Sequence, residues 1–554
     1  MFISSFPLNS RRNGRLLFAI AFLGLISPAF LLAQTATNTL TPSPEVAPAD
    51  ATNSSLSTTV APTNVVNPAP PEPAAPISPA PSPTYLPKPT IDQTGSDSDS
   101  LALAALLVLA SIGGFLLYHC GLTRAKNCGH TSMVLLIGVV FGWLGYWAGG
   151  FAVQNGGVGD AHAAISGDIP ASARDVLDHE FGFMAAGHYW GLMGNSGFFL
   201  TTSASSASGI ASLFLIHASF LSLILGAALG AALERSRIIA MAIASLLISL
   251  VIYPLLANWV WGGGWLAELG SSYGFGHGSI DLAGAGVVHE TAGTLALVIA
   301  VALGPRYGRF ARDKISRIIP GHNLPFVVLG TVILLLALTA ANVLVSGNLS
   351  TTATSLTSLA AVNTLLAAAG GLVISLLTGA WQNLRPEPTR LCRGLLGGAI
   401  ASSAGAALID PWAAFVIGGL AAIFVQGTFT FLEKLRIDDP VGAAATHGAS
   451  GAWGVLATGL FANGLAGQGI NGVESGVRGL FFGGNWHQLA AQGLECVTTF
   501  VVVYILGYAS LILIHKIVGL RAELTDETGG LDWPQIGALG YQGDSDADDL
   551  APRE

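Results

Sequence analysis

Residues 288–293 read Val288-His289-Glu290-Thr291-Ala292-Gly293, and residues 446–451 read Thr446-His447-Gly448-Ala449-Ser450-Gly451. Both segments contain the pattern His-x-x-[Ala/Ser]-Gly within a long apolar stretch. An ionisable residue in such a stretch is expensive in a membrane and indicates a functional position. A structural hydrogen bond between helices is the alternative for each histidine alone. The recurrence of the pattern favours function and suggests an internal repeat.

Apolar stretches long enough to cross a bilayer recur around these two segments. The 554-residue chain is 51% hydrophobic and 10% charged, whereas a soluble globular chain carries about 25% charged residues. A spanning helix needs about 20 mostly apolar residues. The sequence therefore predicts an all-α membrane protein of eleven spans, which start near Leu101, Met133, Ile210, Ile238, Ala283, Leu324, Leu359, Gly394, Trp412, Ala444 and Leu489.

Basic residues are concentrated in alternate loops between these stretches. The positive-inside rule assigns those loops to the cytoplasm, with the amino terminus outside and the carboxyl terminus inside. The two histidine segments fall in the fifth and tenth predicted spans, so the halves that carry them have opposite orientation. This arrangement predicts an inverted five-plus-five repeat and a final helix. The basic residues are Arg124, Lys126, Arg235, Arg237, Arg306, Arg309, Arg312, Lys314, Arg317, Arg385, Arg390, Arg393, Lys434, Arg436, Lys516 and Arg521.

Four regions follow from composition. Residues 1–33 join a positive start to an apolar stretch that ends in small residues, which predicts a signal peptide; an uncleaved helix is the alternative. Residues 34–100 are rich in Pro, Ala and Ser, which predicts a disordered exported tail. Residues 101–516 form the predicted membrane domain, and residues 517–554 form a cytoplasmic tail. Such a chain is expected in a bacterial-type cell inner membrane, with its amino-terminal tail in the periplasm or outside the cell.

The membrane histidines suggest a pathway for a small neutral molecule. Two neutral imidazoles that face each other can each form a hydrogen bond with such a molecule. No cofactor motif is evident. The histidines lack carboxylate or Cys companions at the spacing of metal ligands, so the sequence predicts no metal site. The predicted spans contain no nucleophile–base pair of the kind that would indicate an enzyme. The sequence contains no basic cluster of the kind that would indicate a nucleic-acid partner. The scattered cysteines are interpreted as small packing residues: Cys120, Cys128, Cys392 and Cys496.

Several ordered motifs resemble the ammonium transporter family, known as Amt/Mep/Rh. The likeness extends from about Leu101 to Tyr541. The motifs are Gly121-Leu-Thr-Arg124-Ala-Lys126-Asn127, Trp261-Gly-Gly-Gly, Asp281-Leu-Ala-Gly-Ala-Gly-Val-Val-His289, Gly304-Pro-Arg306-Tyr-Gly-Arg309-Phe, His322-Asn-Leu-Pro325, Asp438-Asp439-Pro440, His447-Gly-Ala-Ser-Gly-Ala-Trp-Gly-Val-Leu-Ala-Thr-Gly-Leu-Phe461 and Gly530-Leu531-Asp532.

The resemblance implies an eleven-span inverted repeat, assembled as a homotrimer with one pore per subunit. It implies that His289 and His447 line a hydrophobic pore that conducts ammonia while the proton is handled separately. It also implies that Trp261 recruits ammonium, that Phe220 closes the pore from outside, and that Asp281 supports the recruitment site. A cytoplasmic PII signal protein is a possible partner for the loop 306–317 and the tail, although Ile536 and Ala538 replace the family's usual residues there.

The sequence departs from the family in the sixth predicted span and nearby. Ala341 occupies the position of a second gate phenylalanine, Val345 replaces a recruiting serine, and Asn342 matches the family. His217 stands where Gln is common, and Glu290 is an unusual acid that serves either a proton route or a packed hydrogen bond. The leading hypothesis is therefore an ammonium transporter. An ammonium sensor and a Rhesus-type electroneutral gas channel with an altered outer gate are the alternatives.

Overall fold

The computed structural model describes residues 96–158, 176–185, 187–201, 207–310, 316–347 and 356–541. The predicted signal peptide, and the predicted exported tail as far as residue 95, lie outside this part of the chain. The first described helix begins at Ser96, and its apolar spanning segment begins at Leu101. Residues 96–100 alternate Ser and Asp, which are favoured in the first turn of a helix.

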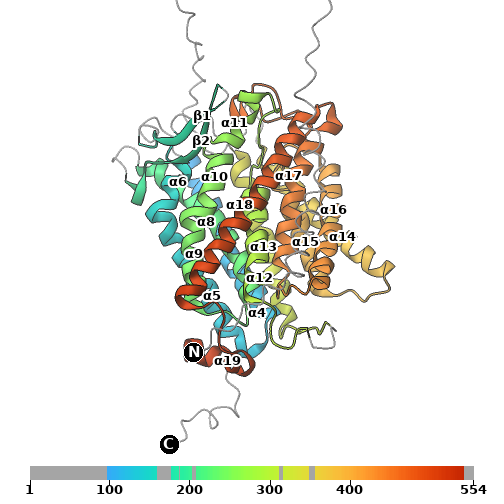
Figure 1. The fold of residues 1–554 in the computed structure, drawn as a ribbon. Coiled ribbons are helices and arrows are strands. Elements are labelled where there is room, and N and C mark those ends of the chain that lie inside the picture. The colour runs from blue at the N-terminus through green and yellow to red at the C-terminus, as the bar shows by residue number, and fades with distance from the viewer. Residues whose placement is uncertain are drawn as a thin grey trace, which may run out of the picture. The chain divides into compact units, whose positions relative to one another are not determined.

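The described chain is mostly helical (Figure 1). Labels with η denote short 3₁₀ or π turns. The elements before the first histidine are α3 (Ser96–Leu109), α4 (Ser111–Leu122), η1 (Ala125–Asn127), α5 (Cys128–Gly145), η2 (Tyr146–Gly150), α6 (Phe151–Asn155), β1 (Glu180–Ala185), β2 (His188–Gly194), η3 (Phe198–Leu200), α8 (Ala207–Leu229), η4 (Gly230–Ala232), α9 (Ile238–Leu247), η5 (Ile248–Ile252), α10 (Tyr253–Trp261) and α11 (Trp265–Tyr273).

The remaining elements begin with the π turn that contains His289. They are η6 (Ala285–Glu290), α12 (Thr291–Leu303), α13 (Leu324–Ser346), α14 (Thr357–Trp381), α15 (Pro388–Ala401), α16 (Pro411–Lys434), η8 (Ala444–Ala449), α17 (Ser450–Phe461), η9 (Ile470–Gly472), η10 (Leu480–Phe482), α18 (Trp486–Val518), α19 (Leu524–Gly529) and α20 (Asp532–Ile536). Helix α18 runs along much of the bundle in Figure 1, and α19 lies at the end opposite the strands.

Nine helical segments of the described residues are long and apolar enough to cross a membrane. They correspond to nine of the eleven predicted spans: Leu101–Leu122, Ala125–Asn155, Ala207–Ala232, Ile238–Tyr273, Ala285–Leu303, Leu324–Ser346, Thr357–Trp381, Pro411–Lys434 and Trp486–Val518. The predicted eighth and tenth stretches are helical too, as α15 and as η8 with α17, but they are not among the nine. Both are shorter than most of the others.

The segment that follows α15 explains why this helix is short. Residues 402–409 leave the regular helix and form turns before α16 begins at Pro411. The side-chain amide of Asn363, on α14, donates to the carbonyls of Ala406 and Ile409, each at 2.8 Å. Irregular backbone inside a membrane requires such internal partners, because lipid offers none.

The hairpin β1–β2 is the one two-stranded sheet among the described residues, and the sequence did not predict it. Its strands are antiparallel, with a register irregularity between Phe181 and Gly182. The hairpin is tied to the helices by the indole nitrogen of Trp259, which donates to the carbonyl of Leu192 at 2.9 Å.

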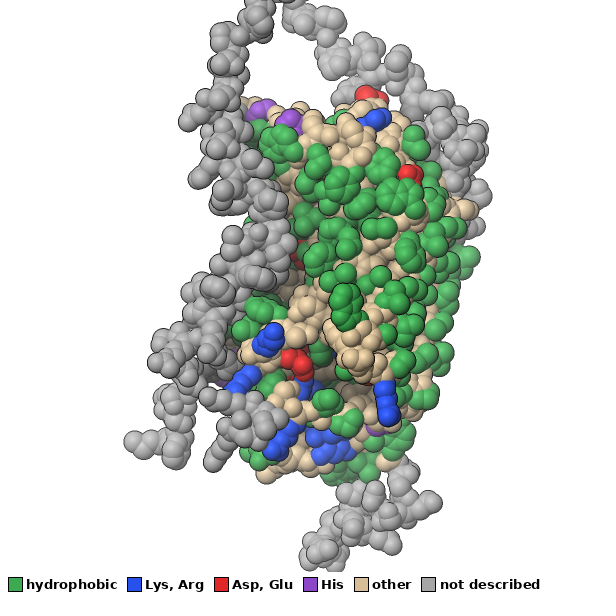
Figure 2. Space-filling view, turned by 90° about the vertical axis from the view of Figure 1, so that its right-hand side faces the viewer, with side chains coloured by type: hydrophobic (Ala, Val, Ile, Leu, Met, Phe, Trp, Pro, Cys, Tyr) green, Lys and Arg blue, Asp and Glu red, His purple; other side chains and the backbone are tan. Residues whose placement is uncertain are grey.

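The surface and the interior divide as expected for a membrane protein. Figure 2 shows hydrophobic side chains over most of the face in view, with Lys and Arg side chains gathered near its lower end. The interior is mostly apolar, and His289 and His447 are buried within it.

Candidate functional site

His289 and His447 meet in the interior. Their Nδ1 atoms are 3.0 Å apart, and their ring centroids are 5.2 Å apart with an interplanar angle of 40°. His289 is 1% exposed and His447 is 6% exposed. Each lies in a π turn, η6 and η8 respectively. Such turns re-aim side chains and recur at functional positions.

Glycine permits the close crossing of the two histidine-bearing helices. A Cβ atom on Gly293 would come within 2.1 Å of the backbone nitrogen of Gly448. A Cβ atom on Gly451 would come within 2.3 Å of the carbonyl oxygen of Ala285. Real Cβ atoms do not tolerate such distances, so these glycines of the repeated motif allow the imidazoles to touch.

An aspartate caps the start of each π turn. Asp281 accepts hydrogen bonds from the backbone N–H groups of Gly286 and Val287, at 3.0 and 2.8 Å. Asp439 likewise accepts from Gly442 and Ala444, at 3.1 and 2.7 Å. Free N–H groups at a helix start favour a carboxylate partner. In both halves the capping aspartate lies eight residues before the histidine (289 − 281 and 447 − 439), a repeat signal that the histidine motif alone did not reveal.

Three aromatic rings form a compact cluster near η6. Phe220 and Trp261 have ring centroids 5.5 Å apart, and His217 lies 5.6 Å from Trp261 and 6.3 Å from Phe220. The Trp261 indole nitrogen donates to the carbonyl of Asp281 at 2.7 Å. All four residues are buried. The structure thus brings together four of the residues that the sequence singled out.

The two candidate residues of α13 are buried but make different contacts. The amide of Asn342 donates to the hydroxyl of Thr364 at 2.8 Å and so joins α13 to α14. Ala341 is 2% exposed. Among the described residues, the ring contacts of the aromatic cluster join His217, Phe220 and Trp261, and no ring from α13 takes part.

Glu290 belongs to a buried group of acids rather than to the imidazole contact. Its side chain interacts with Cys496 and lies close to Asp281. Glu495, on α18, accepts a hydrogen bond from the hydroxyl of Ser279, and its other carboxyl oxygen lies next to Gly286. Among the described residues, one carboxyl oxygen each of Asp281, Glu290 and Glu495 has no hydrogen-bond partner. Sequence reasoning missed Glu495; the signal was a carboxylate near the start of the last predicted span.

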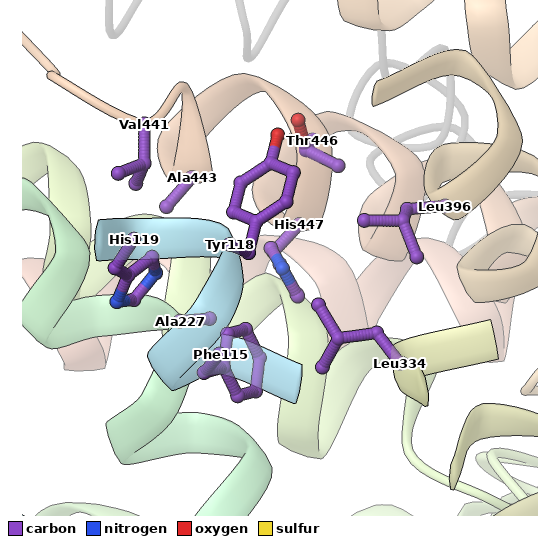
Figure 3. A pocket seen from close by; sticks show the side chains of 10 residues that line it. All are labelled: Phe115, Tyr118, His119, Ala227, Leu334, Leu396, Val441, Ala443, Thr446 and His447. Atoms are coloured by element: carbon purple, nitrogen blue, oxygen red, sulfur yellow. The ribbon is translucent and has the colours of Figure 1, made fainter. Parts of the chain in front are cut away.

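A small cavity opens beside His447 (Figure 3). Phe115, Tyr118 and His119 of α4 line it together with Thr446. His119 lies close to the end of the first predicted span, so its position in the sequence does not mark it as a site residue. His119 is 1% exposed. The ring centroid of Phe115 lies 5.5 Å from that of His119 and 5.9 Å from that of His447.

A network of buried charges ties the loops together at one end of the helices. The Arg306 guanidinium donates to both oxygens of Asp438, at 2.9 and 3.0 Å, and to Glu234 at 2.8 Å. Burial by itself opposes ionisation of Glu234, but the guanidinium groups of Arg306 and Arg124 outweigh it and lower the pKa of Glu234 to about 2. Burial raises the pKa of Asp438, but the Arg306 guanidinium lowers it by more, so the pKa of Asp438 is lowered overall.

Comparisons with known proteins agree with this fold along most of the chain. A family model described as Ammonium Transporter Family matches residues 100–541. Ammonium transporter Amt2 of Archaeoglobus fulgidus is 33% identical over 443 residues, which cover 79% of this chain and 86% of that protein. Ammonium transporter 1 member 1 of Solanum lycopersicum is 32% identical over 402 residues, which cover 68% of this chain and 80% of that protein.

Solved structures show the same architecture. One titled Sensor Amt Protein superposes with a TM-score of 0.66 at 27% identity and covers 79% of this chain and 98% of its own. Mep2 of Candida albicans has a TM-score of 0.63 at 24% identity, covers 82% of this chain and 91% of its own, and supports the fold alone. From these matches, the chain belongs to the ammonium transporter family.

Proposed function

We propose that this protein carries ammonium across a bacterial-type cell inner membrane, passing ammonia between helices while the proton is handled separately. The contact between His289 and His447 carries the proposal, because it sets two buried imidazoles 3.0 Å apart in apolar surroundings. Family membership supports ammonium as the substrate.

The contact restricts what the two rings present to a substrate. A hydrogen bond between two Nδ1 atoms needs one donor and one acceptor, so the neutral rings take opposite tautomers. One ring then keeps Nε2 as an acceptor, and the other keeps Nε2–H as a donor. Ammonia both donates and accepts, and so it matches this pair. An ammonium ion only donates and also loses its hydration, which disfavours the ion at this point.

The cluster of Phe220, Trp261 and His217 suits the step before the imidazoles. An indole face attracts a cation by about 0.5–2 kcal/mol without a competing full charge. The Asp281 carboxylate accepts a hydrogen bond from a backbone N–H group of η6, and its backbone carbonyl accepts one from the Trp261 indole. We assign Asp281 a supporting role through these hydrogen bonds. His217 replaces the missing second phenylalanine as the ring that faces Phe220, which offsets Ala341 in this proposal.

The buried acids support separate handling of the proton. Asp281, Glu290 and Glu495 are buried beside the turn that carries His289: Asp281 accepts from the backbone N–H of Gly286, and Glu495 Oε1 lies next to the same glycine. Buried acids of this kind in a membrane protein are typical of proton pathways. We assign Glu290 and Glu495 to the proton route, with a purely structural hydrogen bond as the alternative for Glu290.

The proposed architecture has eleven spans in an inverted five-plus-five repeat with a final helix. It counts α15 and η8 with α17 as the eighth and tenth spans, in addition to the nine long segments. The matching capped π turns support the repeat. We further propose a cleaved signal at 1–33, an exported tail, a cytoplasmic carboxyl terminus, lipid contact around a homotrimer, and a PII signal protein as a possible cytoplasmic partner.

The decisive experiment uses the purified full chain in liposomes that contain a pH-sensitive dye. An ammonium pulse should evoke a transient current and an internal pH change. Current with pH change supports the transporter. A pH change without current indicates the electroneutral Rhesus-type channel. Folded protein that produces neither defeats the proposal.

An ammonium sensor is the second candidate. The replacements at Ala341 and Val345 favour it, as does the similarity to the structure titled Sensor Amt Protein. This function predicts saturable binding of ammonium without flux in the same liposomes. Flux would remove its basis.

A further inference from the structure

Three residues that line the cavity beside His447 carry polar atoms without a hydrogen-bond partner among the described residues. His119 Nδ1, Tyr118 Oη and Thr446 Oγ1 are buried and accept or donate no hydrogen bond within the described residues. All three residues line this one cavity (Figure 3). Buried polar groups in proteins are nearly always paired, so three polar atoms on residues of one cavity indicate a binding site for a small polar molecule.

The cavity has the size of one small molecule. Its volume is about 10 Å³, close to the minimum that holds one water molecule. Its other walls are apolar, and none of its lining residues is acidic: they include Phe115, Leu334 and Val441. Such a space suits a neutral molecule that both donates and accepts, and it disfavours a cation.

The backbone is shaped to hold His119 in place. A Cβ atom on Gly230 would approach His119 Nε2 to 2.8 Å and the Val441 side chain to 2.5 Å. Glycine at this position therefore leaves room for the imidazole. Phe115 packs against both His119 and His447, so one aromatic ring contacts both imidazoles at the cavity.

We propose that His119 is a third histidine of the ammonia pathway, and that it holds a single ammonia or water molecule with Tyr118 and Thr446 after His447. This site rests on the proposed transport function. A molecule leaving His447 finds hydrogen bonds here instead of a bare apolar wall. The small volume also makes the site a filter against methylated amines.

Flux measurements on full-length protein in liposomes test the role of His119. His119→Phe removes both ring nitrogens and should lower ammonium flux about tenfold, which corresponds to about 1.4 kcal/mol. Leu336→Met, a matched change at an exposed position of α13, should alter flux less than about twofold. His119→Ala should raise the ratio of methylammonium to ammonium flux. Equal flux in wild type and His119→Phe, or an unchanged ratio, overturns the proposal.

A structural readout separates this site from the transport function. Cryo-electron microscopy of wild-type protein with ammonium should show density within hydrogen-bond distance of at least two of the three polar atoms. The same density should be absent in His119→Phe. If wild type conducts no ammonium, the proposed function fails, yet density in the cavity still supports the binding site. An empty cavity in wild type overturns it whatever the flux. His119→Gln replaces His119→Phe should the latter not fold, with density again expected to weaken.

Discussion

Replacing Arg306 by methionine should destabilise the protein strongly. Methionine keeps an unbranched side chain but removes the three side-chain hydrogen bonds to Asp438 and Glu234. Both carboxylates are buried, with 2% and 0% exposed side chains. Breaking a buried ion pair costs about 3–5 kcal/mol, because the remaining charge is left uncompensated. Glu234 keeps Arg124 at 3.1 Å, so we expect a loss near about 3 kcal/mol.

Thermal unfolding of the purified protein in detergent measures this loss, and the midpoint should fall by roughly 3 °C, because the unfolding entropy of about 2.1 cal/mol/K per residue is large for a chain of this length. Arg385→Met at an exposed position is the matched control and should change stability by less than about 0.5 kcal/mol. The double variant Arg306→Met with Glu234→Gln removes one stranded charge and should be more stable than Arg306→Met alone. A single variant within about 1 kcal/mol of wild type, or a double variant less stable than the single, refutes the reasoning.

Three further predictions concern other parts of the molecule. Stability should fall as pH drops from 4.5 towards 2, because the pKa of Glu234 is lowered from 4.5 to about 2 in the folded state. Ionised Glu234 contributes about 3 kcal/mol to the free energy of unfolding, and this contribution is complete above the unfolded pKa. Glu234→Gln should therefore flatten this part of the profile of unfolding free energy against pH. Gly293→Ala should separate the crossing helices and abolish flux while Gly427→Ala, where a Cβ meets no atom within 4 Å, leaves flux intact; equal flux in both would contradict the packing argument. Glu495→Gln should slow the internal pH change that accompanies ammonium flux more than it slows the uptake of isotope-labelled ammonium, and equal slowing would remove Glu495 from the proton route.

The sequence predicted the parts of the fold that depend on local composition. Nine of the predicted spans correspond to long apolar helices, since about 20 apolar residues in a row report directly on membrane crossing. The eighth and tenth stretches were harder to define. Asn363, on α14, donates hydrogen bonds to backbone carbonyls of the irregular segment after α15. No local sequence pattern predicts such a contact between distant segments.

The site shows the same division between local and distant information. The pattern His-x-x-[Ala/Ser]-Gly marked His289 and His447, because its glycines permit the helix crossing that joins the rings. Glu495 and His119 were missed, since their significance arises from partners far along the chain. The hairpin was missed because glycines interrupt both of its strands, and glycine is depleted in strands.

The central claim is that neutral ammonia passes the contact between His289 and His447. The most direct test compares ammonium flux into liposomes for wild type, His447→Leu and the surface control His179→Leu. The account predicts that His447→Leu, correctly folded, loses at least about tenfold in flux, which corresponds to about 1.4 kcal/mol, while His179→Leu equals wild type. Wild-type flux in folded His447→Leu would contradict it.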